Sequence, residues 1–233
     1  MKNSVKRVGK TLLVSALACS TLLTQAQEEN RFDVGADLVS SYVWRGIQQD
    51  LTYSAGSPNI QPYASFSYGN FTVGAWGSGS FTGTVREFDL YASYSFLDNL
   101  SLTVTDYNWN FSKSYFDYSK STDHVYEASL AYGGIEALPL SATVSTMFYG
   151  ADKEEYSTYL ELAYPLSSAV SLSAGASLFE SSLYGTSGFG VTNVALRVEK
   201  SIAFSEQFQL PMFGIVGFNP AAENAYLVVG VSF

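Results

Sequence analysis

The chain has 233 residues and a formal net charge of −9; hydrophobic residues make up 47% of it and charged residues only 14%. The charged share is about half of that in an average soluble domain, while aromatic residues reach 15%. After residue 26 no apolar run approaches the ~18 residues that a membrane-spanning helix needs. If this chain crosses a membrane, it must therefore do so as a closed β-barrel.

Residues 1–26 have the three parts of a cleaved export signal. These parts are a basic start (Lys2, Lys6, Arg7, Lys10), an apolar run over 11–23, and the small-residue site Thr24-Gln25-Ala26. Cleavage there removes four of the 12 basic residues and no acidic one, which leaves 8 against 21 and a net charge of −13. This charge argues against nucleic acid as a partner and leaves cations open.

The only cysteine, Cys19, lies inside this segment. A lipoprotein cleaved before Cys19 is the alternative, but Ala16-Leu17-Ala18 is a poor lipobox. With cleavage after Ala26, the mature chain 27–233 contains no disulfide and no thiol chemistry.

The first mature stretch, 31–49, begins with an alternation of apolar and polar residues that is typical of a two-faced strand. Its apolar face holds Phe32, Val34, Ala36 and Leu38, and its polar face holds Asp33, Gly35 and Asp37. The stretch ends in Tyr42-Val43-Trp44-Arg45-Gly46. We expect Tyr42 and Trp44 to continue the apolar stripe toward lipid, and Arg45 to turn inward with Asp37.

Eleven further segments alternate in the same way, and the pattern is cleanest in 87–96. They are 60–68, 71–78, 87–96, 100–107, 124–132, 140–149, 156–164, 170–178, 191–200, 208–218 and 225–233. Twelve segments of about 8 to 11 residues match tilted membrane-spanning strands.

The connections alternate between mostly long and mostly short, as in outer-membrane barrels with long external loops and short periplasmic turns. The longer ones are 47–58, 79–86, 108–123, 150–155, 179–190 and 219–224; the shorter ones are 69–70, 97–99, 133–139, 165–169 and 201–207. No segment resembles a linker. The fold prediction is therefore one all-β domain over 27–233, an antiparallel up-and-down barrel of twelve strands in the outer membrane of a Gram-negative bacterium.

A secreted β-sandwich or lipocalin-like barrel is the soluble alternative. Its outer face would carry Lys and Glu, whereas the polar faces here hold mainly Ser, Thr, Gly and Tyr. Aromatic residues also mark many strand ends, where interfacial girdles lie. They are Tyr68, Phe71, Phe96, Tyr132, Phe148, Tyr149, Tyr156, Tyr164, Phe208 and Phe218.

The last segment ends in Phe233 after the apolar positions Ala225, Leu227, Val229 and Val231. A final Phe on such a strand resembles the signal that the outer-membrane assembly machinery reads. We expect this strand to pair with the first strand and close the barrel.

The stretch Ser40-Ser41-Tyr42-Val43-Trp44-Arg45-Gly46-Ile47-Gln48-Gln49 resembles the N-terminal motif of the TorF-type porin family. Pro58 with Gln61, then Val73-Gly74-Ala75-Trp76-Gly77-Ser78, and Glu87-Phe88-Asp89-Leu90-Tyr91 with Tyr94 are similar to the segments that come next in members of that family. Ser41 stands where the family often has Asn or Asp. The resemblance is specific over 40–94 and implies a porin; it implies no substrate.

With the polar faces turned inward, seven carboxylates and two arginines line the lumen of the predicted barrel. They are Asp33, Asp37, Arg45, Glu87, Asp89, Glu127, Glu161, Arg197 and Glu199. Glu87 and Asp89 are expected near Arg45 across the lumen. One interpretation is a constriction in a channel for ions or small solutes with a weak preference for cations. The other is a buried ion-pair network that closes the barrel, because unpaired buried charges are costly.

An enzyme would need a catalytic constellation. The single histidine, His124, begins the sixth segment on the lipid-facing side, where outer-membrane lipid hydrolases place such residues, but no Ser motif accompanies it. We therefore predict a rim or girdle histidine and no enzyme.

A surface-binding barrel is the third class of function. The loop acids Asp117, Asp123, Asp152, Glu154 and Glu155 could hold divalent cations that bridge lipopolysaccharide phosphates, but no calcium-loop, zinc or phosphate-loop spacing is present. The predicted partners are outer-membrane lipid, lipopolysaccharide and the assembly machinery, with no cofactor.

Overall fold

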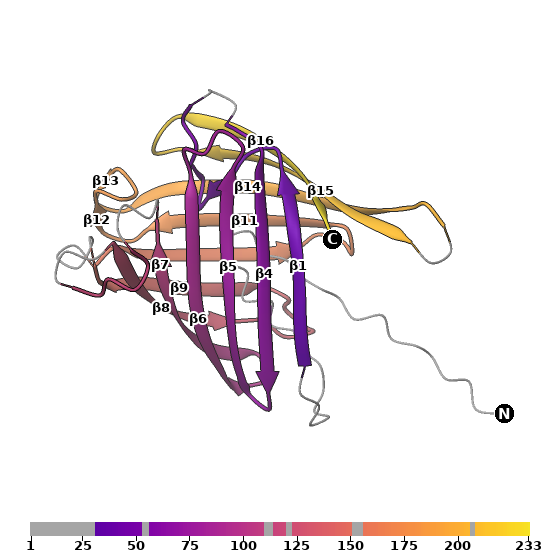
Figure 1. Ribbon diagram of the computed structural model, residues 1–233, viewed down its shortest axis with the longest axis horizontal. Helices are drawn as coiled ribbons and strands as arrows, with labels where there is room; N and C mark the ends of the chain where they lie inside the picture. Colours follow the sequence, from indigo (N-terminus) through magenta and orange to yellow (C-terminus); the bar gives the residue numbers. More distant parts are fainter. Residues whose placement is uncertain (1–30, 53–55, 110–113, 120–122, 151–155, 206–207) are drawn as a thin grey trace.

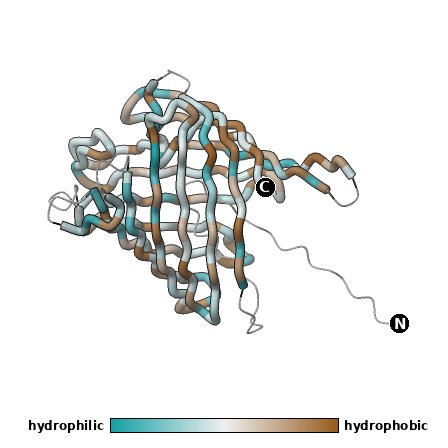
Figure 2. The backbone as a smooth tube through the Cα atoms, in the orientation of Figure 1, coloured by the Kyte–Doolittle hydropathy of each residue, from teal (hydrophilic) through white to brown (hydrophobic). Residues whose placement is uncertain are grey.

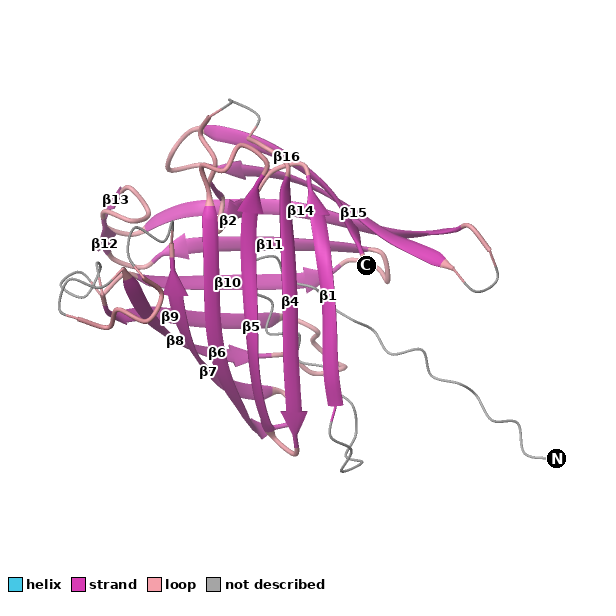
Figure 3. Cartoon of the chain, viewed as in Figure 1, coloured by secondary structure: helices cyan, strands magenta, loops and turns pink. Residues whose placement is uncertain are grey.

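In the computed structural model, the chain forms a closed antiparallel barrel of twelve strands (Figures 1 and 3), which confirms the predicted fold. The structure describes residues 31–52, 56–109, 114–119, 123–150, 156–205 and 208–233. The predicted signal segment 1–26 lies outside these ranges. No helix among the described residues is long and apolar enough to cross a membrane.

The barrel strands follow the predicted segments to within about three residues at each end. They are β1 (Arg31–Val39), β4 (Asn59–Tyr68), β5 (Phe71–Ser80), β6 (Arg86–Leu97), β7 (Leu100–Asn108), β8 (His124–Tyr132), β9 (Ser141–Tyr149), β10 (Thr158–Pro165), β11 (Val170–Ser177), β14 (Gly190–Ala203), β15 (Gln209–Asn219) and β16 (Asn224–Ser232). Two short hairpins lie outside the barrel sheet: β2 (Val43–Trp44) with β3 (Ile47–Gln48), and β12 (Glu180–Ser181) with β13 (Thr186–Ser187).

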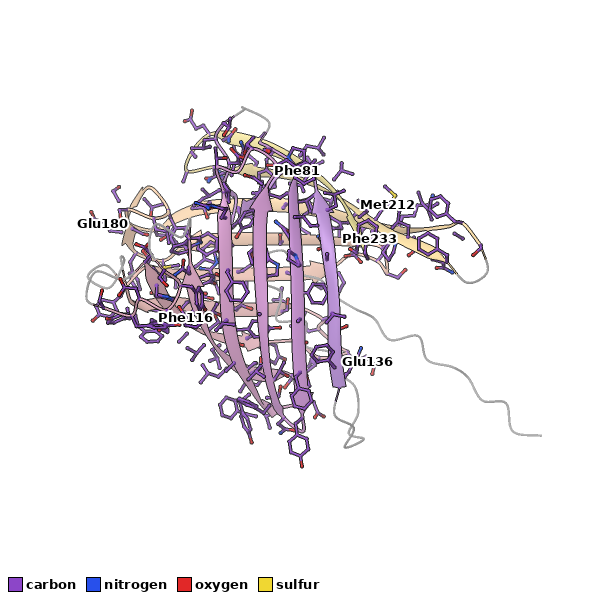
Figure 4. The ribbon with its side chains drawn as sticks, in the orientation of Figure 1. Phe81, Phe116, Glu136, Glu180, Met212 and Phe233 are labelled. Carbon is purple, nitrogen blue, oxygen red and sulfur yellow. The ribbon has the colours of Figure 1, made fainter. Side chains whose placement is uncertain are left out.

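Each strand pairs with its sequence neighbour, and β1 closes the barrel against β16 as predicted. The closing seam is short: β1 pairs with β4 from Arg31 to Val39 but with β16 only from Asp37 to Val39. At its end, Phe233 exchanges backbone hydrogen bonds with Ala36, at 3.0 and 3.3 Å. The β14–β15 hairpin projects beyond the seam, where Met212 is labelled in Figure 4.

The connections divide the barrel into two ends. The short-turn end carries the turns between β4 and β5, β6 and β7, β8 and β9, β10 and β11, and β14 and β15. The long-loop end carries the remaining connections, including Phe81, Phe116 and Glu180 (Figure 4). An even number of strands places both the start of β1 and the end of β16 at the short-turn end.

The outer wall is apolar because the period of two in each strand places its apolar set on one face. The hydropathy colours in Figure 2 alternate along the strands accordingly. The ten aromatic residues predicted for girdles are all exposed. The inner face is polar, and its hydroxyl groups pair across strands, for example Thr103 with Ser93 at 3.0 Å and Ser129 with Ser145 at 2.8 Å.

Candidate functional site

The chain turns inward after β1, and residues 42–49 form a hairpin inside the barrel, here called the inner hairpin. Val43 pairs with Gln48 and Trp44 with Ile47, and Gln49 N donates to Tyr42 O at 2.9 Å. Tyr42 and Trp44 are only 6% and 4% exposed. The prediction that they continue the lipid-facing stripe is therefore wrong.

The turn of the inner hairpin explains this departure. Its two central residues, Arg45 and Gly46, have φ of 51° and 80°, as in the type I′ turn that matches the twist of a two-residue hairpin. A chain that makes this turn reverses direction after Trp44, so it cannot continue β1. A Cβ on Gly46 would lie 1.9 Å from the Thr192 carbonyl oxygen, so glycine is required by the close approach as well as by φ.

The tip of the inner hairpin is tied to the wall that β14 and β15 form. Thr192 Oγ1 donates to Arg45 O at 3.1 Å, and Asn219 Nδ2 donates to Gly46 O at 3.2 Å. Val43 packs against an apolar cluster on β1, β14, β15 and β16, made up of Val39, Ala195, Phe213, Ile215 and Val228.

The other side of the inner hairpin packs into an aromatic cluster. Tyr42 and Trp44 join Tyr107, Val125, Met147, Tyr159 and Tyr184, with Trp76 and Trp109 at the margin. Trp44 stacks on Tyr184 at 5.9 Å between ring centroids, and Tyr184 stacks on Tyr159 at 5.3 Å. Tyr184 belongs to the connection between β12 and β13, so two long-loop connections meet inside the barrel.

The Arg45 side chain makes the central contact of the site. Its Nη1 and Nη2 donate to Glu127 Oε2 and Oε1 of β8 at 2.7 and 2.8 Å, and Nη1 also donates to Tyr184 Oη. The guanidinium lies 4.4 and 4.7 Å from the ring centroids of Trp44 and Tyr159. Arg45 is 7% exposed and Glu127 1%, so this is a buried, bidentate ion pair.

Glu127 is further fixed by neighbours on its own wall. Tyr107 Oη and Ser129 Oγ donate to its Oε1 at 3.0 and 3.2 Å. The ion pair therefore connects β8 to an inner hairpin that is also anchored on β14 and β15. β8 and β14 are separated by three strands in the barrel order.

Glu87 and Asp89, which were expected near Arg45, form no ion pair with it; the partner of Arg45 is Glu127. They are buried on β6, where Trp109 Nε1 donates to Glu87 Oε1 at 2.7 Å and Asn108 N donates to Asp89 Oδ1 at 3.3 Å. Glu161 on β10 is also buried. One oxygen of each of these three carboxylates has no hydrogen-bond partner among the described residues.

The remaining lining candidates lie on β14 and β1. Arg197 Nε donates to Glu199 Oε1 at 2.7 Å, and its guanidinium lies 3.9 Å from the ring centroid of Phe213. Asp33 and Asp37 are partly buried on the inward face of β1. Both lining arginines are thus paired with glutamates, and within the described part of the chain the other five lining carboxylates form no ion pair with an arginine.

His124 begins β8 on the outward face as predicted, but its side chain is exposed neither at the rim nor in the aromatic girdle. It is fully buried (0% exposed) beneath residues 114–119, which lie against the outer wall. Its Nδ1 contacts Asp106 Oδ1 at 2.6 Å, and its Nε2 contacts Tyr115 O at 2.5 Å and Asn108 Nδ2 at 3.1 Å. These contacts fasten a loop to the barrel wall.

The loop acids form no metal site in the described ranges. No group of three or more His, Cys, Asp or Glu is placed to hold a metal ion there. Asp117 accepts a hydrogen bond from Ser119 N at 3.0 Å, which closes a local turn. Asp152, Glu154 and Glu155 lie outside the described residues.

Among solved structures, the chain is similar to a KdgM porin at 11% sequence identity, over 86% of this chain and 97% of that one, with a TM-score of 0.47. It is also similar to a KdgM porin in complex with disordered oligogalacturonate, at 12% identity over 87% and 97% of the two chains, with a TM-score of 0.44. No protein-family model and no curated protein sequence matches the chain.

Proposed function

We propose that this protein is an outer-membrane channel of porin type for ions or small solutes, exported by a signal over residues 1–26 and belonging to the TorF-type family. The observation that supports it most strongly is a closed twelve-stranded barrel with an apolar outer wall and a charged inner wall. Apolar exteriors of this kind belong in lipid, and a barrel of twelve strands is wider than those that side chains alone fill.

We further propose that the channel prefers cations. Arg45 and Arg197 are each neutralised by a glutamate, so five of the predicted lining carboxylates, Asp33, Asp37, Glu87, Asp89 and Glu161, have no arginine partner among the described residues. Arg31, at the start of β1 and in phase with Asp33, is the one further inward cation of the described barrel strands. A lining with an excess of one sign concentrates the opposite ion.

Planar-bilayer recordings under a KCl gradient test this proposal. A reversal potential of the sign expected for K⁺ supports it, and replacing Asp33 and Asp37 together by Asn should reduce that potential. Glu136→Gln is the matched control, because Glu136 is exposed in the turn between β8 and β9 at the short-turn end (Figure 4). Anion selectivity contradicts the proposal. So does an absence of conductance from protein whose heat-modifiable mobility on gels shows that it is folded.

A non-conducting barrel is the second candidate, and the inner hairpin is the observation that favours it. The hairpin carries aromatic residues on one side and Val43 on the other, and both sides are packed. If it blocks flow completely, wild-type protein will be silent in the bilayer and a variant that displaces the hairpin will conduct.

We propose no enzymatic activity. Asp106 and His124 form a hydrogen-bonded pair like that of a hydrolase base and its orienting acid, but the Nε2 that would face a nucleophile contacts the Tyr115 carbonyl oxygen. A lipid-hydrolase activity that His124→Ala abolishes would overturn this view.

A further inference from the structure

The outer wall is hollowed near the long-loop end. Alternation on β5 turns Ala75, Gly77 and Gly79 outward, and these small residues leave space between the larger side chains of β4 and β6. Gly77 faces Phe88 across the β5–β6 ladder, while Ile60 and Pro62 border the hollow on β4. The resulting groove has a volume of about 460 Å³ and its lining is largely apolar.

Tyr115 borders the groove from outside the barrel sheet. Its ring meets the Phe88 ring edge-on at 5.2 Å between centroids. The segment is held there by His124, whose ring contacts Tyr115 at 5.0 Å and stacks on Tyr118 at 4.1 Å. Tyr118 Oη also donates to Asp106 Oδ2 at 3.3 Å. The contact of buried His124 with the partly buried Asp106 thus positions one wall of the groove.

A cationic residue stands at the loop-side end of the groove. Arg86 is the cross-strand partner of Gly79, and alternation on β6 turns it outward with Phe88. Lys200, the other cation that the described barrel strands turn outward, lies near the short-turn end. An apolar groove in the lipid-facing wall with a guanidinium at its aqueous end matches an acyl chain below a phosphate.

We propose that this groove binds an acyl chain of the phosphorylated lipid of the outer leaflet, the lipid A part of lipopolysaccharide, with a phosphate at Arg86. This inference rests on the proposed membrane location, which puts the long-loop end in the outer leaflet. The groove is continuous with the apolar wall that lipid would cover, and the overall acidity of the chain makes an outward cation at this position conspicuous.

Filling the groove tests the proposal without touching the lumen. A Cβ on Gly79 would meet no atom within 4 Å, so Gly79→Leu places its side chain in open groove space without backbone strain. Gly214→Leu is the matched control: a Cβ at Gly214 also meets nothing within 4 Å, and its ladder partners Val198 and Val229 are exposed on the outer wall far from the groove.

The assay is binding of bis-phosphorylated lipid A to the full chain, delipidated in a neutral detergent and measured by native mass spectrometry. We expect Gly79→Leu to weaken binding at least tenfold and Gly214→Leu to change it less than twofold. Arg86→Gln should abolish the preference for bis-phosphorylated over dephosphorylated lipid A. Equal binding by wild type and Gly79→Leu, or no preference for the phosphorylated form in the wild type, overturns the proposal.

The experiment distinguishes failure of the lipid-binding proposal from failure of the channel proposal. Gly79 lies outside the lumen, so Gly79→Leu should insert into vesicles and conduct like the wild type, whatever its lipid binding. Failure of every variant and the wild type to insert would instead count against the membrane location itself.

Discussion

Removing the Arg45 side chain should loosen the inner hairpin by an amount that the structure allows us to estimate. The informative substitution is Arg45→Asn, because Asn is favoured at the first central position of a type I′ turn. It keeps the backbone of the turn and deletes both hydrogen bonds to Glu127 and the contacts with Trp44 and Tyr159.

Two opposing contributions set the magnitude. Leaving Glu127 buried and unpaired costs about 3–5 kcal/mol. Relieving an L-residue other than Asn or Gly of a left-handed conformation returns about 1 kcal/mol. The free energy of unfolding should therefore fall by about 2–4 kcal/mol.

Glu127→Gln completes a double-mutant cycle. Arg45→Asn with Glu127→Gln leaves no uncompensated charge, so the double variant should be more stable than the sum of the single losses predicts, by about 1.5–3 kcal/mol. Arg197→Gln is the control, because the Arg197–Glu199 pair is more exposed and we expect a loss of at most about 1 kcal/mol.

Urea unfolding in lipid vesicles, followed by tryptophan fluorescence, measures these differences. The chain has three tryptophans, and Trp44, Trp76 and Trp109 all belong to or border the aromatic cluster around the inner hairpin. Strictly additive single losses, or equal losses in Arg45→Asn and Arg197→Gln, would refute the central role given to the Arg45–Glu127 pair.

Three further predictions concern other contacts of the inner hairpin and the barrel seam. Gly46→Ala should displace the hairpin tip from Thr192 and shift tryptophan emission to longer wavelength. Gly83→Ala is the control, because Gly83 also has a positive φ (75°) but open space around an added Cβ. It should lower the free energy of unfolding by only about 1 kcal/mol and leave the emission unchanged. Burial acts to raise the pKa of Asp50, but hydrogen bonds from Thr52 and Thr82 hold that pKa below its ordinary value. The carboxylate therefore stabilises the loop above pH about 4, and this contribution is lost as the pH falls. Asp50→Asn should lower the free energy of unfolding by about 1 kcal/mol at pH 7 and by less at pH 3, as measured by urea unfolding at both pH values. Deleting Phe233 removes both hydrogen bonds to Ala36 at the short seam and should slow insertion into vesicles, whereas Phe233→Ala should keep them; equal insertion rates for the deletion and the wild type would contradict a role for these bonds.

The strand pattern was predictable because a period of two is a local property. Phe88, Leu90 and Ala92 face one solvent and Glu87, Asp89 and Tyr91 the other, whatever the rest of the chain does. The pairing of β1 with β16 then results from counting strands. The same alternation led to the wrong placement of Tyr42 and Trp44. Both have even numbers like Phe32 to Leu38, but the chain has turned inward before it reaches them. Ser40-Ser41 breaks the alternation, and Arg45 in place of the usual Asn conceals the type I′ turn.

The partners inside and outside the barrel could not be predicted in the same way. Glu127 lies 82 residues from Arg45, and their meeting depends on the shear of the closed barrel and on the inward turn of the hairpin. Nor does the position of His124 on the outward face reveal that residues 114–119 cover it. A histidine diagonal to Asp106 in the β7–β8 hairpin was the available signal, since neighbouring outward positions on paired strands lie within reach of each other.

Whether the channel conducts depends on the free-energy difference between the seated and unseated positions of the inner hairpin. Each 1.4 kcal/mol changes the ratio of seated to unseated hairpin tenfold. If the 2–4 kcal/mol lost in Arg45→Asn falls on the seated state alone, that ratio changes by about 30- to 700-fold. If ions pass beside a seated hairpin, this variant will retain the wild-type conductance and add brief larger openings. If the seated hairpin blocks the lumen, the wild type will be closed and Arg45→Asn will show openings. Adding Glu127→Gln removes the unpaired charge, so the double variant should show openings of the same size at a lower frequency. The two records differ in kind, so a single comparison distinguishes a constricted channel from a closed one.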